Sequence, residues 1–174
     1  MNFRNERINI ATKKDILRIV ELLNMGYRGE KSRKGWTTEA DLISGEIRSN
    51  EDDVRGVMEE EGSVFLVYTH DGGEVSGCMN LKKQSRRIYL GMFAVEPELQ
   101  ARGIGGELMK AAEEYATYQD CSSIYMYVIS VRDELISWYK RKGFEDTGER
   151  VPFQENFTGK HMRPLEFAIL EKNI

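Results

Sequence analysis

The sequence has only two cysteines, Cys78 and Cys121, among its 174 residues. The pair lacks the spacing of metal ligands, and both thiols lie in apolar segments typical of strands, where free cysteine behaves as a small hydrophobe. We therefore expect both thiols in the core and no metal site.

Long apolar runs and an excess of basic residues are also missing. No stretch approaches the ~18 apolar residues of a membrane span, and residues 1–7 lack the apolar core of a signal peptide. The formal net charge of −4, with 40% apolar and 31% charged residues, is that of an ordinary globular protein and disfavours a polyanionic partner. We expect a cytoplasmic protein that binds neither nucleic acid nor membrane, and we leave a homodimer open.

What the sequence does contain fits one domain, 1–174, which buries roughly 70% of its unfolded surface. Alternating polarity predicts a first strand at 7–11, and helical spacing predicts a helix from the capping pair Thr12 and Asp15 to Gly26. The polar connector that follows, 27–37, is typical of a solvated loop. Short helices are predicted at 37–43 and 52–60.

From Ser63 the apolar pattern changes to the period of a sheet. The predicted strands are 64–68, 75–81, 88–95, 124–129, 144–150 and 165–170, and the predicted helices are 104–115 and 133–142. Turn residues at 70–73 indicate a hairpin between the first two of these strands. Residues 124–129 are continuously apolar, which is typical of an interior strand covered on both faces.

The most informative stretch is the glycine loop that joins the strand at 88–95 to the helix at 104–115. Gly103, Gly105 and Gly106 let backbone N–H groups approach a ligand, and the first turn of the helix adds free donors and a positive dipole end. A dinucleotide fingerprint needs glycine where Leu108 stands, and a triphosphate loop needs a Gly-Lys-Ser/Thr ending that is absent. The loop therefore indicates a phosphate site for another ligand.

Three motifs together resemble the GNAT superfamily of N-acetyltransferases: Gln100-Ala101-Arg102-Gly103-Ile104-Gly105, Phe93-Ala94-Val95-x-Pro97 and Trp138-Tyr139-x-x-x-Gly143-Phe144. Over nearly the whole chain, the resemblance implies an α/β (α+β) fold with a mixed, mostly antiparallel central sheet flanked by helices. It also implies acetyl-CoA as co-substrate, without a metal. The cofactor-binding positions that it implies are Met92, Phe93, Ala94 and Val95 for the pantetheine arm, and Gln100, Ala101, Arg102, Gly103, Ile104, Gly105 and Gly106 for the pyrophosphate. Many relatives have glycine in place of Ala101.

The resemblance implies direct attack of a substrate amine on the thioester, so that no cysteine nucleophile is needed. A backbone N–H within 91–93, where the strand splays from its neighbour in relatives, is expected to bind the carbonyl oxygen. Tyr139 matches the general acid that protonates the leaving thiolate. Proton transfer from a phenol with a pKa near 10 to a thiolate whose thiol has a pKa of roughly 8.5 is slightly unfavourable. A modest environmental shift would close this difference in pKa. Its helical spacing from Leu135 and Ile136 is also that of a core aromatic, and the two roles are compatible.

The identity of the general base stays open, because the strand at 88–95 contains no carboxylate, whereas many relatives have a glutamate there. Glu39 and Asp41 are candidates, since substrate walls in relatives come from that region, although both also suit a charged helix start. The weaker candidates are Tyr125, Tyr127 and His161.

The acceptor that the resemblance implies is a primary amine of a small molecule or peptide. Trp36 and Glu39 are the expected substrate-binding residues, with Trp36 on a lid that also carries Arg28 and Arg33, or else filling a local apolar gap. Arg132 replaces an asparagine of many relatives, and its role stays open. Acidic residues at 51–61 either attract a cationic amine or form a solvated face. A catalytically silent acyl-CoA sensor is the alternative function.

Overall fold

The computed structural model describes residues 1–153 and 162–174, so His161 lies outside the described residues. The strands are β1 (Ile8–Ile10), β2 (Ser63–Thr69), β3 (Val75–Gln84), β4 (Arg87–Val95), β5 (Ser123–Ile129), β6 (Glu145–Pro152) and β7 (Glu166–Asn173). The helices are α1 (Ile16–Tyr27), α2 (Gly29–Ser32), α3 (Glu51–Glu59), α4 (Ile104–Tyr118) and α5 (Asp133–Arg141), with 3₁₀ turns η1 (Lys13–Asp15) and η2 (Pro97–Leu99). Most predicted elements are confirmed, with their ends shifted by a few residues.

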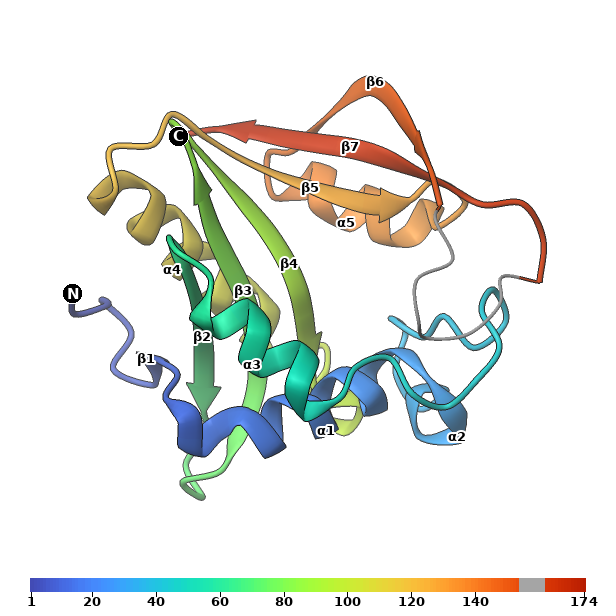
Figure 1. Ribbon diagram of the computed structural model, residues 1–174, viewed down its shortest axis with the longest axis horizontal. Helices are drawn as coiled ribbons and strands as arrows, with labels where there is room; N and C mark the ends of the chain where they lie inside the picture. Colours follow the sequence, from blue (N-terminus) through green and yellow to red (C-terminus); the bar gives the residue numbers. More distant parts are fainter. Residues whose placement is uncertain (154–161) are drawn as a thin grey trace.

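The strands form one sheet in the order β1-β2-β3-β4-β5-β7-β6 (Figure 1). Every neighbouring pair is antiparallel except β4 and β5, which run parallel. The predicted mixed, mostly antiparallel sheet flanked by helices is therefore confirmed, and so is the interior position of β5.

Helices cover both faces of the sheet, with a core on each face, and a third, smaller buried cluster joins Ile43, Ile129 and Leu165. Because side chains alternate along a strand, β2 contributes Phe65 to the core beneath α1 and α3, and Leu66 to the larger core beneath α4 and α5. Cys78 lies in the first core and Cys121 in the second, both as free thiols. The prediction of two core thiols is confirmed.

The two parallel strands separate soon after they begin. β4 pairs with β5 only over Arg87–Tyr89, although β4 continues to Val95. A bulge against β3 inserts an extra residue on β4, and Met92 there has a left-handed φ of 44°. Bulges bend a strand and redirect its backbone. Figure 1 shows β4 and β5 diverging into a wedge that opens toward α2.

Two predictions for the segment between the first helix and α3 are wrong, and the helix itself ends one residue later than predicted. Helix α1 continues through Gly26, where a Cβ would lie 3.3 Å from that of Ala94, so glycine there permits close packing on β4 rather than ending the helix. The connector is not a solvated loop, because it contains α2 and buries Arg28 at 3% exposure. Residues 37–43 form turns rather than a helix, since tertiary hydrogen bonds hold Thr37 to Gly26 and to Gln100.

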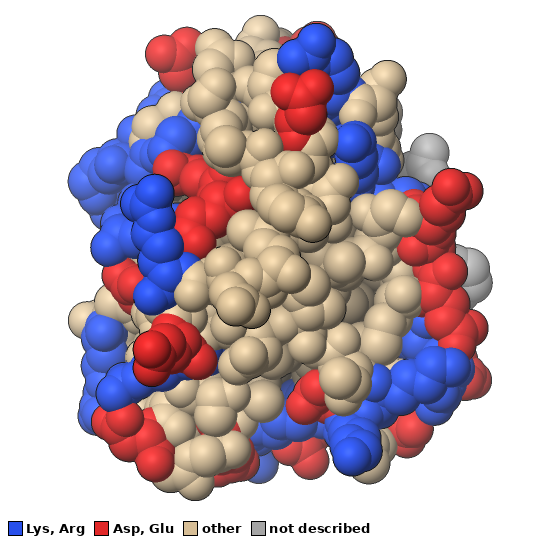
Figure 2. Space-filling model, turned by 90° about the vertical axis from the view of Figure 1, so that its left-hand side faces the viewer, with Lys and Arg blue, Asp and Glu red and all other residues tan. Residues whose placement is uncertain are grey.

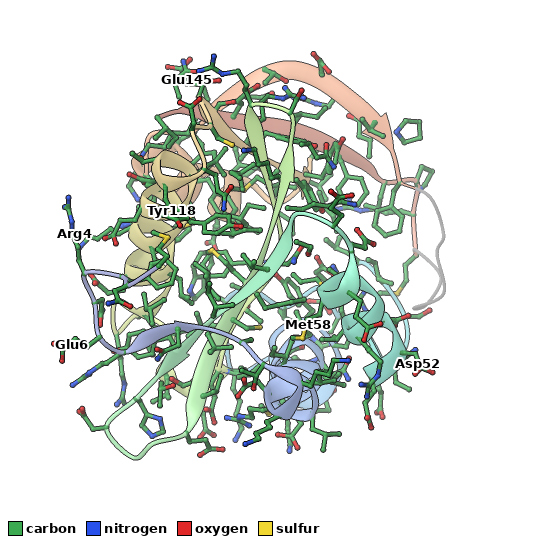
Figure 3. The ribbon with its side chains drawn as sticks, turned by 60° about the vertical axis from the view of Figure 1, so that its left-hand side comes forward. Arg4, Glu6, Asp52, Met58, Tyr118 and Glu145 are labelled. Carbon is green, nitrogen blue, oxygen red and sulfur yellow. The ribbon has the colours of Figure 1, made fainter. Side chains whose placement is uncertain are left out.

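Charges of both signs are interleaved around the margin of the face shown in Figure 2. The acidic residues at 51–61 lie on α3 and just after it, and Asp52 points away from the sheet in Figure 3. Glu59 and Glu60 form ion pairs with Lys13 and Lys82. In the described parts of the chain, no helix is long and apolar enough to cross a membrane.

Burial of Cys78 predicts a loss of stability at alkaline pH. Burial raises the pKa of this thiol to about 12, whereas a thiol in an unfolded chain titrates near roughly 8.5. Between these values the unfolded chain releases a proton that the folded protein keeps. The free energy of unfolding therefore falls by up to about 1.4 kcal/mol per pH unit for this group. We expect the urea midpoint to decline between about pH 9 and 11 and to decline less steeply for Cys78→Ala. Equal slopes in the two proteins would contradict this assignment.

Candidate functional site

The glycine loop after β4 exposes the backbone donors of helix α4. Gly103 precedes the helix with a φ of 89° and no side-chain cap, and the Glu107 N–H is the first to bond back, to the Gly103 carbonyl at 3.0 Å. The N–H groups of residues 104–106 are therefore free of the helical ladder. Ala101 has a φ of 63°, a left-handed backbone that glycine adopts more readily than alanine.

A groove of about 830 Å³ runs along this loop, β4 and α5. Seven of the predicted cofactor residues line it: Phe93, Val95, Gln100, Ala101, Gly103, Gly105 and Gly106. A Cβ at Gly105 would lie 3.4 Å from Phe93 and 3.6 Å from Trp138, so glycine keeps the groove open. Of the other four, Ala94 and Ile104 are buried in the cores, Arg102 is exposed, and Met92 faces a second cavity.

The side chains along the groove are balanced in charge. Lys110, Arg141 and Lys142 are matched by Glu107, Asp133 and Glu134. Hydrogen bonds from Lys110 and Asn5 hold the pKa of Glu107 below its usual range, so this carboxylate is charged but paired. Lys142 Nζ lies 3.4 Å from the position of a Cβ on Gly106. The attraction for an anion therefore comes from the start of α4 and from Lys142.

Gln100 uses its side chain to fasten the connector to β4. Its Oε1 accepts the Trp36 N–H at 2.9 Å, and its Nε2 donates to Thr37 Oγ1 at 2.9 Å and to the Val95 carbonyl at 3.1 Å. The Trp36 ring, expected on the substrate side, lines the groove instead, with its centroid 6.1 Å from that of Trp138.

A second cavity of about 430 Å³ lies between β4 and β5, where the strands have separated. Aromatic rings of Tyr89, Tyr127, Phe153 and Phe167 line it. The cavity and the groove share Tyr27, Phe93, Leu135 and Tyr139. The two spaces therefore meet at these four residues.

Tyr139 lies at this junction and is 6% exposed, with its ring against Trp138 and Phe144. Burial raises the pKa of Tyr139 well above its ordinary value, with a smaller contribution from Tyr27 and an opposing one from Arg132. This direction is opposite to the shift that would match the phenol to a thiolate. The environment therefore widens the difference in pKa between the phenol and the thiol, because burial disfavours the charged phenolate.

Tyr27 is a residue that the sequence pattern missed, because it looked like the start of the polar connector. It ends α1, and its hydroxyl donates to the Phe93 carbonyl beside the bulge. Burial raises the pKa of Tyr27 to about 12, so the hydroxyl keeps its proton at neutral pH. The ordered end of α1 thus holds the strand edge at the junction.

Of the acidic candidates for the base, only Glu39 reaches the second cavity. Its carboxylate accepts a hydrogen bond from Arg28 and lies 3.6 Å from Arg132, which also donates to the Trp36 carbonyl at 3.4 Å. Asp41 is exposed and pairs with Arg33 at 2.9 Å. Arg132, for which the sequence suggested no role, thus links the connector to α5.

The two tyrosines that were candidates for the general base lie in different places. Tyr127 lines the cavity and is 41% exposed, whereas the Tyr125 hydroxyl donates to Gln84 outside it. Within residues 1–153 and 162–174, no group of three or more His, Cys, Asp or Glu side chains is placed to hold a metal ion.

Comparison with known proteins agrees with this architecture. Residues 43–163 match the family described as the acetyltransferase (GNAT) domain, and the chain belongs to this family. No curated protein matches the sequence. Members of the family are acetyl-CoA-dependent N-acetyltransferases.

Solved structures share the fold at low sequence identity. Ard1 from Thermoplasma volcanium has a TM-score of 0.72 and 22% identity, covering 96% of each chain. The ribosomal-protein-S18-alanine N-acetyltransferase from Escherichia coli has a TM-score of 0.71 and 14% identity, covering 96% of this chain and 92% of that one. A spermidine N-acetyltransferase chimera from Vibrio cholerae and hSSAT has a TM-score of 0.69 and 16% identity, covering 95% and 94%. The names of the last two describe different acceptors on one fold.

Proposed function

We propose that the protein transfers an acetyl group from acetyl-CoA to a primary amine of a small molecule or peptide by direct attack on the thioester. The observation that carries this proposal is the meeting of the groove and the second cavity at Tyr139. One space suits the cofactor arm and the other suits the acceptor. A transfer reaction needs this arrangement, because its two substrates must meet at one point.

The groove fits acetyl-CoA on three counts. The start of α4 presents free N–H donors for phosphate oxygens, and the glycines at 103, 105 and 106 leave room for them. The wedge leaves β4 from Leu90 onward without a strand neighbour on its β5 side, so this edge is open to the pantetheine arm except at the Phe93 and Val95 carbonyls, which accept from Tyr27 and Gln100. When bound, acetyl-CoA supplies an acetyl group activated as a thioester.

In the proposed reaction a bond forms between the amine nitrogen and the acetyl carbon while the carbon–sulfur bond breaks. The β4 backbone beside the bulge binds the carbonyl oxygen, and Tyr139 donates its proton to the sulfur. Glu39 is already engaged by two arginines, so the amine loses its proton to water, and the Tyr139 phenolate regains a proton from water before the next turnover. The rate should therefore rise with pH until the amine is neutral.

The test is release of free thiol from acetyl-CoA in the presence of polyamines, amino acids and peptides, with the acetylated product identified by mass spectrometry. We expect product with at least one class of amine. Stabilisation of the protein by acetyl-CoA without any product would instead support the acyl-CoA sensor. Absence of both stabilisation and product would contradict both functions.

A further inference from the structure

The second cavity carries an excess of positive charge. Its charged side chains in the described part of the chain are Arg28, Arg48, Arg132 and Glu39, so three guanidinium groups face one carboxylate. The whole chain has the opposite sign, with a net charge of −4. The positive cavity is thus a local feature that the overall composition does not explain.

Each of these arginines has a buried nitrogen with no hydrogen-bond partner: Arg28 Nε, Arg48 Nε and Arg132 Nη1. The side chains of Arg28 and Arg132 are only 2% and 8% exposed. Buried charged donors are costly unless they are paired and hydrogen-bonded. Arg132 Nη1 still lies 3.6 Å from the Glu39 carboxylate, but one carboxylate neutralises only one of the three charges, so the cluster keeps a net positive charge that favours an anion in the cavity.

The three guanidinium groups act on the same part of the cavity. Arg28 and Arg132 share Glu39, and the Arg48 guanidinium lies 5.2 Å from the centre of the Tyr27 ring. Arg48 and Arg132 both favour the charged form of the Tyr27 hydroxyl, although burial outweighs them and raises its pKa. Because Tyr27 is one of the junction residues, the positive charge lies close to the proposed point of transfer.

Given the proposed acetyl transfer, we propose that the acceptor is a free amino acid with an apolar side chain, whose carboxylate binds the cluster of Arg28, Arg48 and Arg132 while its amine faces Tyr139. Guanidinium groups bind carboxylates through paired, charge-assisted hydrogen bonds. The aromatic rings of the cavity suit an apolar side chain. The same positive field lowers the pKa of a nearby ammonium group and so favours the reactive neutral amine. A polyamine without a carboxylate meets net repulsion, because three guanidinium groups outweigh the single carboxylate of Glu39.

The test compares amino acids with amines that lack only the carboxylate: phenylalanine with phenethylamine, and leucine with 3-methylbutylamine. We expect kcat/KM to be roughly 100-fold lower for the amines, since each charge-assisted hydrogen bond contributes substantially. Arg48→Met should raise KM for the amino acids at least about 10-fold more than it raises KM for the amines, because only the amino acids lose a carboxylate contact. Arg33→Met is the matched control, because Arg33 is exposed and pairs outside the cavity.

Thermal unfolding gives a readout that needs no acetyl transfer. N-acetylphenylalanine and phenylalanine should raise the Tm of the protein and of Arg33→Met, but not of Arg48→Met. A Tm raised equally by phenethylamine, no rise with either carboxylate, or a rise that survives Arg48→Met would each overturn the carboxylate site. Carboxylate binding without thiol release would instead overturn the proposed transfer alone. Equal rates of thiol release with the amino acids and with the amines that lack the carboxylate would overturn the amino-acid acceptor alone.

Discussion

Gly106→Glu should abolish acetyl-CoA binding while the protein stays folded. Gly106 lies within α4, where glutamate is a better helix former by roughly 0.5–1 kcal/mol. The added Cβ meets only the flexible end of Lys142, at 3.4 Å. Its carboxylate would lie at the positive end of the helix dipole, occupy the donors proposed for phosphate and repel the cofactor. We expect affinity to fall on the order of 100-fold or more, as measured by calorimetric titration.

Two controls separate charge from bulk at this position. Gly106→Ala adds the Cβ without charge and should bind acetyl-CoA more tightly than Gly106→Glu does. Thr117→Glu places the same charge on the same helix, away from the groove, and should bind like the parent. If Gly106→Glu bound acetyl-CoA as well as the parent does, the start of α4 would not be the phosphate site.

Tyr139→Phe should lower kcat by roughly 100-fold, as expected for loss of a general acid. The ring contacts with Trp138 and Phe144 persist in this variant, so we expect the affinity for acetyl-CoA to change little. Because burial raises the pKa of Tyr139, the parent enzyme keeps this proton in alkaline solution. We therefore expect Tyr139 to stay protonated up to about pH 10, so that kcat does not fall with rising pH in this range through loss of its proton.

The matched control for Tyr139 is Tyr118→Phe, which removes a hydroxyl from an exposed tyrosine on α4 (Figure 3). Steady-state rates of thiol release are measured for the parent and both variants at several pH values. A Tyr139→Phe variant as fast as the parent would remove this residue from the proposed chemistry and leave it as a core aromatic.

Local sequence patterns predicted the glycine loop because its requirements are local. Gly103 is needed where the backbone takes a φ of 89°, and the apolar spacing of α4 begins immediately afterwards. The interior strand β5 was predictable for a similar reason, since a continuous apolar run is the direct consequence of cover on both faces. Features set by one short segment are visible in that segment.

The second cavity, proposed for the acceptor, could not be predicted in this way, because its lining comes from residues far apart in the chain. Arg28 is buried through its contact with Glu39, and Glu39 is held in turn by Arg132 from the start of α5. A polar connector has the same composition whether its arginine is solvated or buried. The raised pKa of Tyr139 could not be predicted for the same reason, since Phe144 and Tyr27 enclose it only in the folded chain.

The most direct test of the central claim uses the two tryptophans of the chain as probes. Both Trp36 and Trp138 line the groove proposed for acetyl-CoA, with ring centroids 6.1 Å apart. Titration with acetyl-CoA should change the tryptophan emission of the parent saturably at micromolar ligand, and the change should be lost in Gly106→Glu. Emission that stays constant up to millimolar acetyl-CoA would contradict cofactor binding in this groove.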